Sequence, residues 1–270
     1  MIYNCHTHTL HSHDSRAPVE AMCEAAIGAG LSGLAVTDHC DCEYAAEDDV
    51  FNKIRASVLD ASACRERYAG KLLVMTGVEL GDALFDPAFA REITAAFDYD
   101  IILGSVHAVR SKKDDTPFSR IDFSHWTDSE IEGYLRQYFD DLLQTMEDFD
   151  FDVVSHLTVP LRYICGKYHK QVREADYLPQ ITEILQKTIA MGKTLELNTQ
   201  SADTAGGLCP NSAVIDLYLS LGGTRFSLGS DAHTPEMIAA GLETGKALLL
   251  SRGVTHANFY LNRKCIPYAL

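Results

Sequence analysis

The sequence lacks any run of about eighteen consecutive apolar residues, so we expect no membrane-spanning helix. It also lacks a charged leader before an apolar core, so no secretory signal is expected. Basic residues are few, because 23 lysines and arginines stand against 38 aspartates and glutamates, a formal net charge of −15. This balance argues against nucleic acid or an anionic membrane as the main partner.

Cysteine is present, but not in a pattern typical of a disulfide framework. The eight cysteines are scattered along the chain, and Cys40-Asp41-Cys42 lacks the spacing of a zinc knuckle. Without a secretory leader, reduced thiols are the expectation. We therefore expect a cytoplasmic protein, and the sequence leaves its oligomeric state open.

Length and composition are those of one globular domain. The chain has 270 residues, of which 46% are hydrophobic and 23% are charged. This length suits a single barrel better than a single sandwich. Because neither a low-complexity linker nor a short-period repeat interrupts the sequence, we predict that residues 1–270 form one domain.

Short apolar segments alternate with helical segments along the chain. Leu72-Leu73-Val74-Met75 and Ile101-Ile102-Leu103 are continuous apolar runs, as expected for parallel strands that are buried on both faces. Seven strands separated by helices favour an α/β barrel over an open sheet. The predicted strands span residues 2–5, 34–37, 72–76, 101–105, 152–155, 194–198 and 225–229.

Several helices have recognisable ends. Thr127-Asp128-Ser129-Glu130 is a capping box that introduces a helix over the following apolar positions. Pro18 is expected to open a helix that stops near Gly30, and Thr234-Pro235 a long last helix that closes near Gly253. Further helices are expected over residues 50–70 and 178–192.

The most unusual stretch begins at the sixth residue. Four histidines and an aspartate fall between His6 and Asp14. Side chains of an extended segment alternate with period two, so His6 and His8 point to one side and can reach the same metal ion. A polar arm or tag remnant would be the alternative, but a tag would be an uninterrupted run. We therefore predict a metal site.

Polar residues of ligand type also follow the other predicted strands. The carboxyl ends of parallel strands meet on one face of a barrel, where barrel enzymes keep their chemistry. A metal centre assembled at this face is therefore expected. In chain order, the residues at the strand ends are His6, His8, Asp38, His39, Glu79, His107, His156, Asn198, Asp231 and His233.

These motifs resemble those of the polymerase and histidinol phosphatase (PHP) superfamily, most of all its stand-alone histidinol-phosphate phosphatases. The resemblance implies a distorted seven-stranded, TIM-like barrel with two or three divalent metals at the carboxyl ends of the strands. The matching segments, in family order, are His6-Thr7-His8-Thr9, Thr37-Asp38-His39, Gly77-Val78-Glu79, Gly104-Ser105-Val106-His107, Ser155-His156-Leu157 and Gly229-Ser230-Asp231-Ala232-His233.

The resemblance also implies three metal positions. The first would be held by His6, His8, Glu79 and Asp231. Glu79 would bridge to a second position that His107 and His156 complete. The third would be held by Asp14, His39 and His233, with His13 as an alternative to Asp14. Imidazole and carboxylate ligands suit Zn, Mn or Fe.

The remaining histidines are expected to lie outside the ligand set. His11 is expected beside the ligands or on the surface. The other three have no motif around them and are expected on the surface; they are His125, His169 and His256.

The expected reaction is hydrolysis of a small phosphomonoester, with L-histidinol phosphate the first substrate to try. Two cations bridged by Glu79 would hold a hydroxide and neutralise the phosphoryl oxygens. Asp38 or His233 would deliver a proton to the leaving alkoxide or position a water. The alternatives are a PHP phosphodiesterase or nuclease that acts on nucleotides, and a metal-binding barrel without turnover.

Phosphate recognition is expected from Arg162, in the loop after the fifth strand, and from Asn198. The family tends to place a second basic residue shortly after Asn198, and here Asp203 occupies that place. The bases that could substitute are Arg110, Lys167 and Lys170. The long segment 111–127 is interpreted either as a lid or as a disordered surface insertion.

Overall fold

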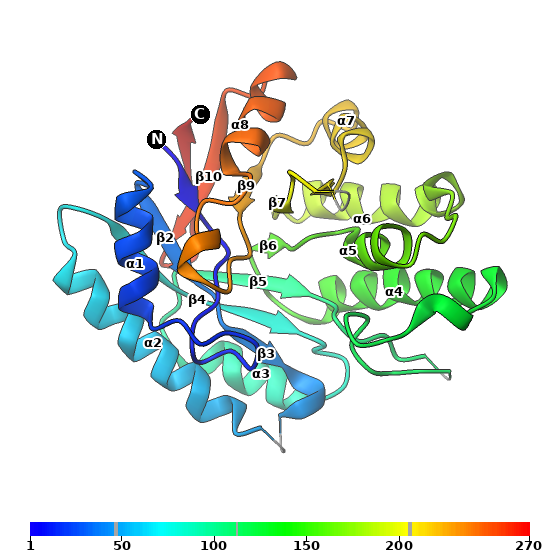
Figure 1. Ribbon diagram of the computed structural model, residues 1–270, viewed down its shortest axis with the longest axis horizontal. Coiled ribbons are helices and arrows are strands. Elements are labelled where there is room, and N and C mark those ends of the chain that lie inside the picture. Colours follow the sequence, from blue (N-terminus) through cyan, green and yellow to red (C-terminus); the bar gives the residue numbers. More distant parts are fainter. Residues whose placement is uncertain (46–47, 112, 205–206) are drawn as a thin grey trace.

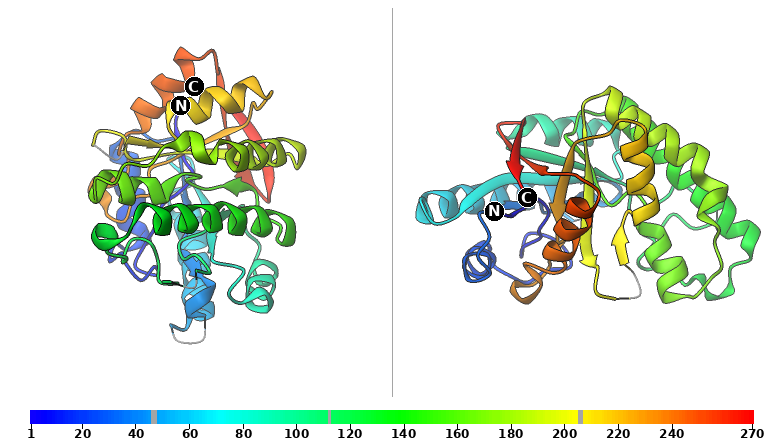
Figure 2. Two further views of the ribbon diagram at one scale, coloured as in Figure 1. Left: turned by 90° about the vertical axis from the view of Figure 1, so that its right-hand side faces the viewer. Right: turned by 90° about the horizontal axis from the view of Figure 1, so that it is seen from above.

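The computed structural model describes residues 1–45, 48–111, 113–204 and 207–270. Its main feature is a nearly closed barrel of seven parallel strands, with helices around the outside (Figures 1 and 2). This confirms the predicted fold class. In chain order, the parallel strands are β1 (Tyr3–Asn4), β2 (Gly33–Val36) with its continuation β3 (His39–Asp41), β4 (Leu73–Gly81), β5 (Ile101–Ser105), β6 (Val153–Val154), β7 (Thr194–Ser201) and β9 (Phe226–Gly229).

Neighbouring strands pair in the order β1-β2-β4-β5-β6-β7, with β9 beside β7. The seam between the first and last strands is closed by a parallel bridge between Thr7 and Ala232 and by a 2.8 Å hydrogen bond from the Cys5 N–H to the Leu228 carbonyl. Short β8 (Gly207–Cys209) runs antiparallel to β7. The seam matters for function because it brings His6 and Asp231 together.

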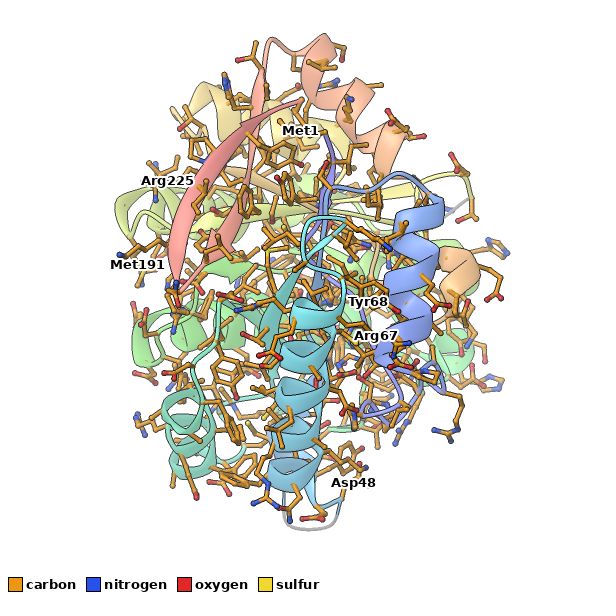
Figure 3. The ribbon with its side chains drawn as sticks, turned by 90° about the vertical axis from the view of Figure 1, so that its left-hand side faces the viewer. Met1, Asp48, Arg67, Tyr68, Met191 and Arg225 are labelled. Carbon is orange, nitrogen blue, oxygen red and sulfur yellow. The ribbon has the colours of Figure 1, made fainter. Side chains whose placement is uncertain are left out.

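Helices connect the strands, and the predicted ones over residues 18–30, 50–70 and 178–192 are present. In Figure 3, Arg67 and Tyr68 lie where α2 ends beside α1; Arg67 pairs with Glu20, and the Tyr68 hydroxyl donates to Glu24.

No helix in the described part of the chain is both long and apolar enough to cross a membrane. The helices are α1 (Val19–Gly28), α2 (Val50–Arg67), α3 (Pro87–Ala96), α4 (Asp128–Asp148), α5 (Val159–Leu161), α6 (Leu178–Ala190), α7 (Ser212–Ser220) and α8 (Leu242–Ser251).

The prediction of one long helix from Thr234 to Gly253 is wrong. A short 3-10 turn (Pro235–Met237) and α8 replace it, and Gly241 between them has a φ of 63°. A side chain at Gly241 would place its Cβ 2.5 Å from the Thr199 carbonyl oxygen. The helix is therefore broken where the backbone passes close against β7.

The amino end of the barrel is closed by a hairpin that the sequence analysis did not predict. Strands β10 (His256–Leu261) and β11 (Lys264–Ala269) pair antiparallel. Phe259 and Tyr260 pack in one cluster with Met75 and Leu103 from the barrel strands. Tyr3 stacks on Phe259 with ring centroids 4.1 Å apart. The barrel interior is thus filled with apolar side chains below the metal-ligand level.

The capping box at the start of α4 is present as predicted. The Glu130 N–H donates to Thr127 Oγ1 at 3.3 Å, and the Thr127 N–H donates to Glu130 Oε2 at 2.8 Å. This helix packs its apolar side against the barrel and precedes β6, and His156 follows that strand.

We expect Thr127→Ala to lower the free energy of unfolding by about 1 kcal/mol, because the Glu130 N–H loses its side-chain acceptor. Urea denaturation would measure the change. Ser129→Ala, an exposed change within the same turn, is the matched control. Equal stabilities of the two variants would show that the box contributes nothing.

Candidate metal centre

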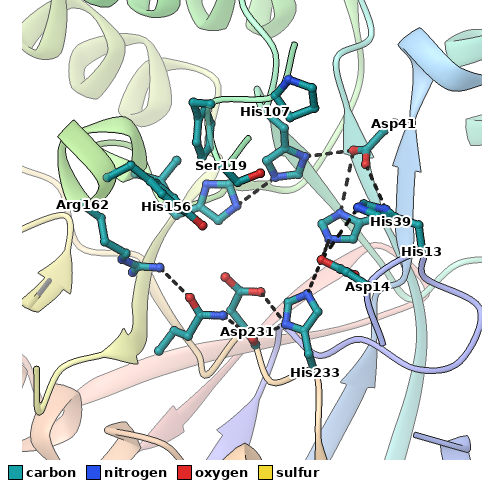
Figure 4. Close-up of a pocket in the computed structure, with 15 residues that line it drawn as sticks. His13, Asp14, His39, Asp41, His107, Ser119, His156, Arg162, Asp231 and His233 are labelled. Carbon is teal, nitrogen blue, oxygen red and sulfur yellow. Dashed lines mark hydrogen bonds and ion pairs between the residues drawn. The ribbon is translucent and has the colours of Figure 1, made fainter. Parts of the chain in front are cut away.

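The predicted ligands converge at the carboxyl ends of the strands. His6 and His8 follow β1, and His39 opens β3 directly beside Glu79 of β4 in the parallel register. His107 follows β5. Two other ligand-type residues sit in turns with positive φ, His156 at 26° after β6 and Asp231 at 51° after β9. These turns direct both side chains into the pocket that Figure 4 shows.

The first group joins His6, His8, Glu79 and Asp231. The Nε2 atoms of His6 and His8 lie 3.0 Å apart, and Asp231 Oδ1 lies 3.1 Å from His8 Nε2. Glu79 Oε2 lies 3.4 Å from His6 Nε2 and 3.6 Å from His8 Nε2. Tetrahedral ligands at about 2.0–2.1 Å from one ion are roughly 3.3 Å apart. His6, His8 and Asp231 therefore form one group that could hold a metal ion, and Glu79 Oε2 lies beside both imidazoles of that group.

The second group shares Glu79. Its other oxygen, Oε1, lies 2.8 Å from His156 Nε2 and 3.3 Å from His107 Nε2. The two imidazole nitrogens are 3.4 Å apart. Glu79 thus offers one oxygen to each group, which is the arrangement of a bridging carboxylate.

The third group brings Asp14 together with His39 and His233. Asp14 Oδ2 lies 3.1 Å from His233 Nε2 and 3.6 Å from His39 Nε2. His13 instead faces Asp41, with its Nδ1 at 3.7 Å from Asp41 Oδ2. Between the two candidates, the geometry favours Asp14.

Several buried polar atoms of these groups have no hydrogen-bond partner in the described structure. Among them are Glu79 Oε2, His39 Nδ1, His156 Nδ1 and His233 Nε2. Glu79 Oε2 and His233 Nε2 lie close to other ligand atoms but do not form hydrogen bonds with them, as expected when lone pairs converge on a cation. The residues present therefore fit divalent metal ions.

The electrostatics of the cluster are strained without cations. Burial disfavours a charged His6, yet Glu196, Glu79 and Asp231 raise its pKa well above the ordinary value. Burial and the neighbouring His39 and His233 lower the pKa of His8 to about 3. Despite their burial, nearby carboxylates also raise the pKa values of His39, His107 and His233, so without cations these imidazoles would hold protons where metal binding needs lone pairs. Cations would replace those protons.

Two carboxylates missed by the sequence analysis stand behind the ligands. Glu196 Oε1 lies 2.7 Å from His6 Nδ1, and Asp41 Oδ1 lies 2.9 Å from His107 Nδ1. Leu195-Glu196-Leu197 carried a signal, since a lone acid within a buried strand needs a partner. Asp41 lies in Cys40-Asp41-Cys42, outside the motifs that carry the predicted ligands. Both cysteines are free, buried thiols.

Arg162 enters the pocket from the side opposite His39 and Asp14 (Figure 4). It lies at the start of a π-helical turn, Arg162–Lys167. Its Nη1 donates to Gln200 Oε1 and its Nη2 to Asn198 Oδ1, both at 2.8 Å. Asn198 Nδ2 in turn donates to Asp231 Oδ2 at 3.2 Å. Asn198 and Gln200 therefore hold the guanidinium toward the metal ligands.

Asp38 has its carboxylate oxygens occupied. It accepts hydrogen bonds from the Thr9 N–H and from three hydroxyls, those of Thr9, Ser12 and Ser57, at 2.6–2.7 Å. It is fully buried and does not line the pocket. The carboxylate thus secures the loop that carries His8 and Asp14.

The three alternative bases do not face the pocket. Arg110 is held by Asp141 and Gln144. Lys170 donates to two main-chain carbonyls at 2.9 Å, and Lys167 lies over the Tyr168 ring. Among the described pocket residues, Arg162 is therefore the one Arg or Lys side chain.

The segment 111–127 packs against the molecule, apart from Lys112, which lies outside the described residues. Phe118 is buried and lines the pocket beside Pro117 and Ser119. The Phe118 N–H donates to the His107 carbonyl at 2.9 Å. Of the two interpretations, a cover over the pocket agrees better with this placement than a surface insertion does.

The other histidines lie outside the cluster. His11 Nε2 pairs with Asp60 Oδ2 at 2.8 Å, away from the pocket lining. The three histidines expected on the surface are exposed, namely His125, His169 and His256.

Comparisons with known proteins agree with the motif resemblance. The PHP domain family matches residues 4–200. A protein of Clostridium acetobutylicum named "Probable histidinol-phosphatase" is 23% identical over 272 residues, covering 100% of both chains. The histidinol-phosphatase of Lactococcus lactis is 24% identical over 92% of this chain and 90% of its own.

A solved structure has the same fold. The histidinol phosphate phosphatase of Lactococcus lactis, complexed with zinc, L-histidinol and phosphate, superposes with a TM-score of 0.78 over 98% of both chains at 20% sequence identity. At this identity, the similarity supports the barrel architecture.

Proposed function

Because the chain belongs to the PHP domain family, we propose that it is a metal-dependent phosphatase that hydrolyses a small phosphomonoester, L-histidinol phosphate before others. We also propose that residues 1–270 act as one domain. The names of the relatives support the substrate, since both are histidinol-phosphatases by name and align over nearly the whole chain.

The observation that carries the proposal is the charge around the pocket. Five carboxylates surround it or stand directly behind its ligands, while one arginine faces them. A dianionic phosphate would be repelled by this set alone. Two divalent cations would neutralise the charge of these groups, and a third would make it positive. The five carboxylates are Asp14, Asp41, Glu79, Glu196 and Asp231.

We assign the cations to the three groups of side chains, with Glu79 shared by the first two and Asp14, His39 and His233 holding the third. Zn, Mn and Fe all suit imidazole and carboxylate ligands. When bound, these ions act as Lewis acids toward phosphoryl oxygens and lower the pKa of water toward neutrality.

The protein's own part is to hold the substrate and the ligands in place. Arg162 would pair with the phosphate through N–H donors that Asn198 and Gln200 do not use, and its buried Nε has no other partner. Asn198 takes part by orienting Arg162. His233 remains a candidate for proton delivery, whereas we assign Asp38 to the support of the loop 9–14.

We expect the purified protein to carry about two to three transition-metal ions per chain, because the ligand-type side chains offer the three groups assigned above. Elemental analysis after gentle purification, with and without added zinc or manganese, would measure this. Trace occupancy even after metal is supplied would contradict the assignment.

Hydrolysis of three substrates with added manganese or zinc tests the function. Preferred hydrolysis of L-histidinol phosphate over p-nitrophenyl phosphate supports the proposal. Faster hydrolysis of bis(p-nitrophenyl) phosphate would favour the phosphodiesterase alternative. A metal-loaded protein that hydrolyses none of the three would be a metal-binding barrel without turnover.

A further inference from the structure

Glu196 is a charged residue in the middle of a buried strand. It lies in β7, is 1% exposed, and has buried leucines on both sides in the sequence. An ionised carboxylate in such a place needs strong donors. Neither the family motifs nor the pocket lining include it. Its contacts therefore have to explain why it is there.

Each oxygen of Glu196 accepts one hydrogen bond from a different part of the metal centre. Oε1 lies 2.7 Å from His6 Nδ1, on the side of the ring away from Glu79 and Asp231. Oε2 accepts from the main-chain N–H of His156, also at 2.7 Å. One carboxylate thus contacts the first group through a ring and the second group through the backbone.

The two contacts have different consequences. A carboxylate can only accept, so it fixes the proton of neutral His6 on Nδ1 and leaves the Nε2 lone pair free for an ion. The contact with His156 holds a residue whose φ of 26° is unfavourable for a side chain with a Cβ. This turn is what directs His156 Nε2 to Glu79, 2.8 Å away.

Gly229 provides independent evidence that the barrel is built around this carboxylate. A Cβ at Gly229 would lie 2.2 Å from Glu196 Oε1 and 2.7 Å from the His6 Cβ. Gly229 lies in β9, which pairs with β7. A side chain at this position would push Glu196 away from His6, so glycine is required for the contact.

We propose that Glu196 is a positioning residue that couples the first two metal positions, by fixing the tautomer of His6 and the backbone of His156 with one carboxylate. The inference rests on the proposed metal centre. It concerns metal binding, however, and does not depend on which phosphate ester is the substrate.

Glu196→Gln is the sharpest test because an amide cannot satisfy both partners. If its oxygen accepts from His156, its NH2 faces His6 Nδ1 and favours the tautomer whose Nε2 carries the proton. If its oxygen accepts from His6, its NH2 faces the His156 N–H. Either way one metal position loses its preorganised ligand.

We expect Glu196→Gln to bind its metals about 10- to 100-fold more weakly, measured by competition with a chromophoric chelator. Nitrogen NMR of the zinc-loaded protein should show the ring nitrogens of His6 or the main-chain nitrogen of His156 shifted in the variant, because the amide can satisfy only one of the two. Asp152→Asn is the matched control, since Asp152 is 9% exposed and accepts from the Ile102 N–H at 2.8 Å and from Arg263. Asp152 directly precedes β6, at the end of the strand opposite the pocket, so its variant should keep wild-type metal affinity.

Wild-type metal affinity in Glu196→Gln, or equal losses in Glu196→Gln and Asp152→Asn, would overturn the proposal. Should Glu196→Gln not fold, Glu196→Asp takes its place. It keeps the charge but is one methylene too short to reach both donors, so weaker metal binding supports the proposal and unchanged binding overturns it. A failure of the phosphatase assay alone would leave these measurements intact and would count only against the proposed function.

Discussion

Glutamine in place of Glu79 is expected to reduce kcat/KM about a thousandfold or more while the barrel still folds. Glu79 offers Oε2 to the first group and Oε1 to the second. The amide keeps the shape of the side chain but removes the negative charge that two cations would share, and its NH2 cannot act as a ligand. Both positions should therefore lose affinity together.

Steady-state kinetics at saturating metal, with elemental analysis of the same samples, would measure this effect. Glu43→Gln is a matched control. Burial and the nearby Asp82 raise the pKa of Glu43 to about 10, so at neutral pH the amide replaces an already neutral group. Near-normal turnover in Glu79→Gln would mean that Glu79 does not bridge.

The convergence of the proposed ligands could be predicted from the sequence because it depends on two simple regularities. The spacing of His6 and His8 follows from the period of an extended chain. The gathering of Glu79, His107 and His156 follows from the rule that parallel strands end on one face. Both regularities can be read from short stretches of sequence, so short motifs are enough to predict them.

The residues that the sequence did not predict are defined by contacts across the barrel. Glu196 is marked in the sequence as a buried acid that needs a partner, but only the fold shows that the partner is His6, 190 positions away. The role of Asp41 needs His107 in place, and the break at Gly241 before the last helix needs the Thr199 carbonyl beside it. Such contacts join segments far apart in the chain, where hydrophobic period and turn chemistry carry no information.

The contacts of Asp38 are another feature that its position in the sequence does not reveal. Its position between the second strand and His39 made it a candidate proton donor, but the neighbouring residue in a strand points the other way. The structure turns Asp38 toward Thr9, Ser12 and Ser57, while His39 faces Glu79. The closeness of Asp38 to His39 in the sequence does not show to which side the Asp38 side chain points.

Arg162→Ala is expected to lower kcat/KM on the best phosphomonoester by about thirty- to a hundred-fold, the equivalent of a charge-assisted contact of roughly 2–3 kcal/mol. Metal content should not change, because arginine is not a ligand. Arg162→Lys should restore only part of the loss, since an ammonium cannot form two parallel hydrogen bonds and cannot span Asn198 and Gln200. Steady-state kinetics and elemental analysis of each variant would measure both quantities.

Little redundancy should protect the Arg162 variant. Asp203 occupies the place where a second base was expected, and its carboxylate is 3.4 Å from the Thr244 hydroxyl. Arg110→Ala is the matched control, because Arg110 follows β5 but is turned to Asp141 and away from the pocket. We expect this control to keep near wild-type kcat/KM. If instead Arg162→Ala left kcat/KM unchanged and Arg110→Ala or Lys167→Ala reduced it, the phosphate would be bound by one of these bases, and the covering segment 113–127 would have to move to bring that base into the pocket.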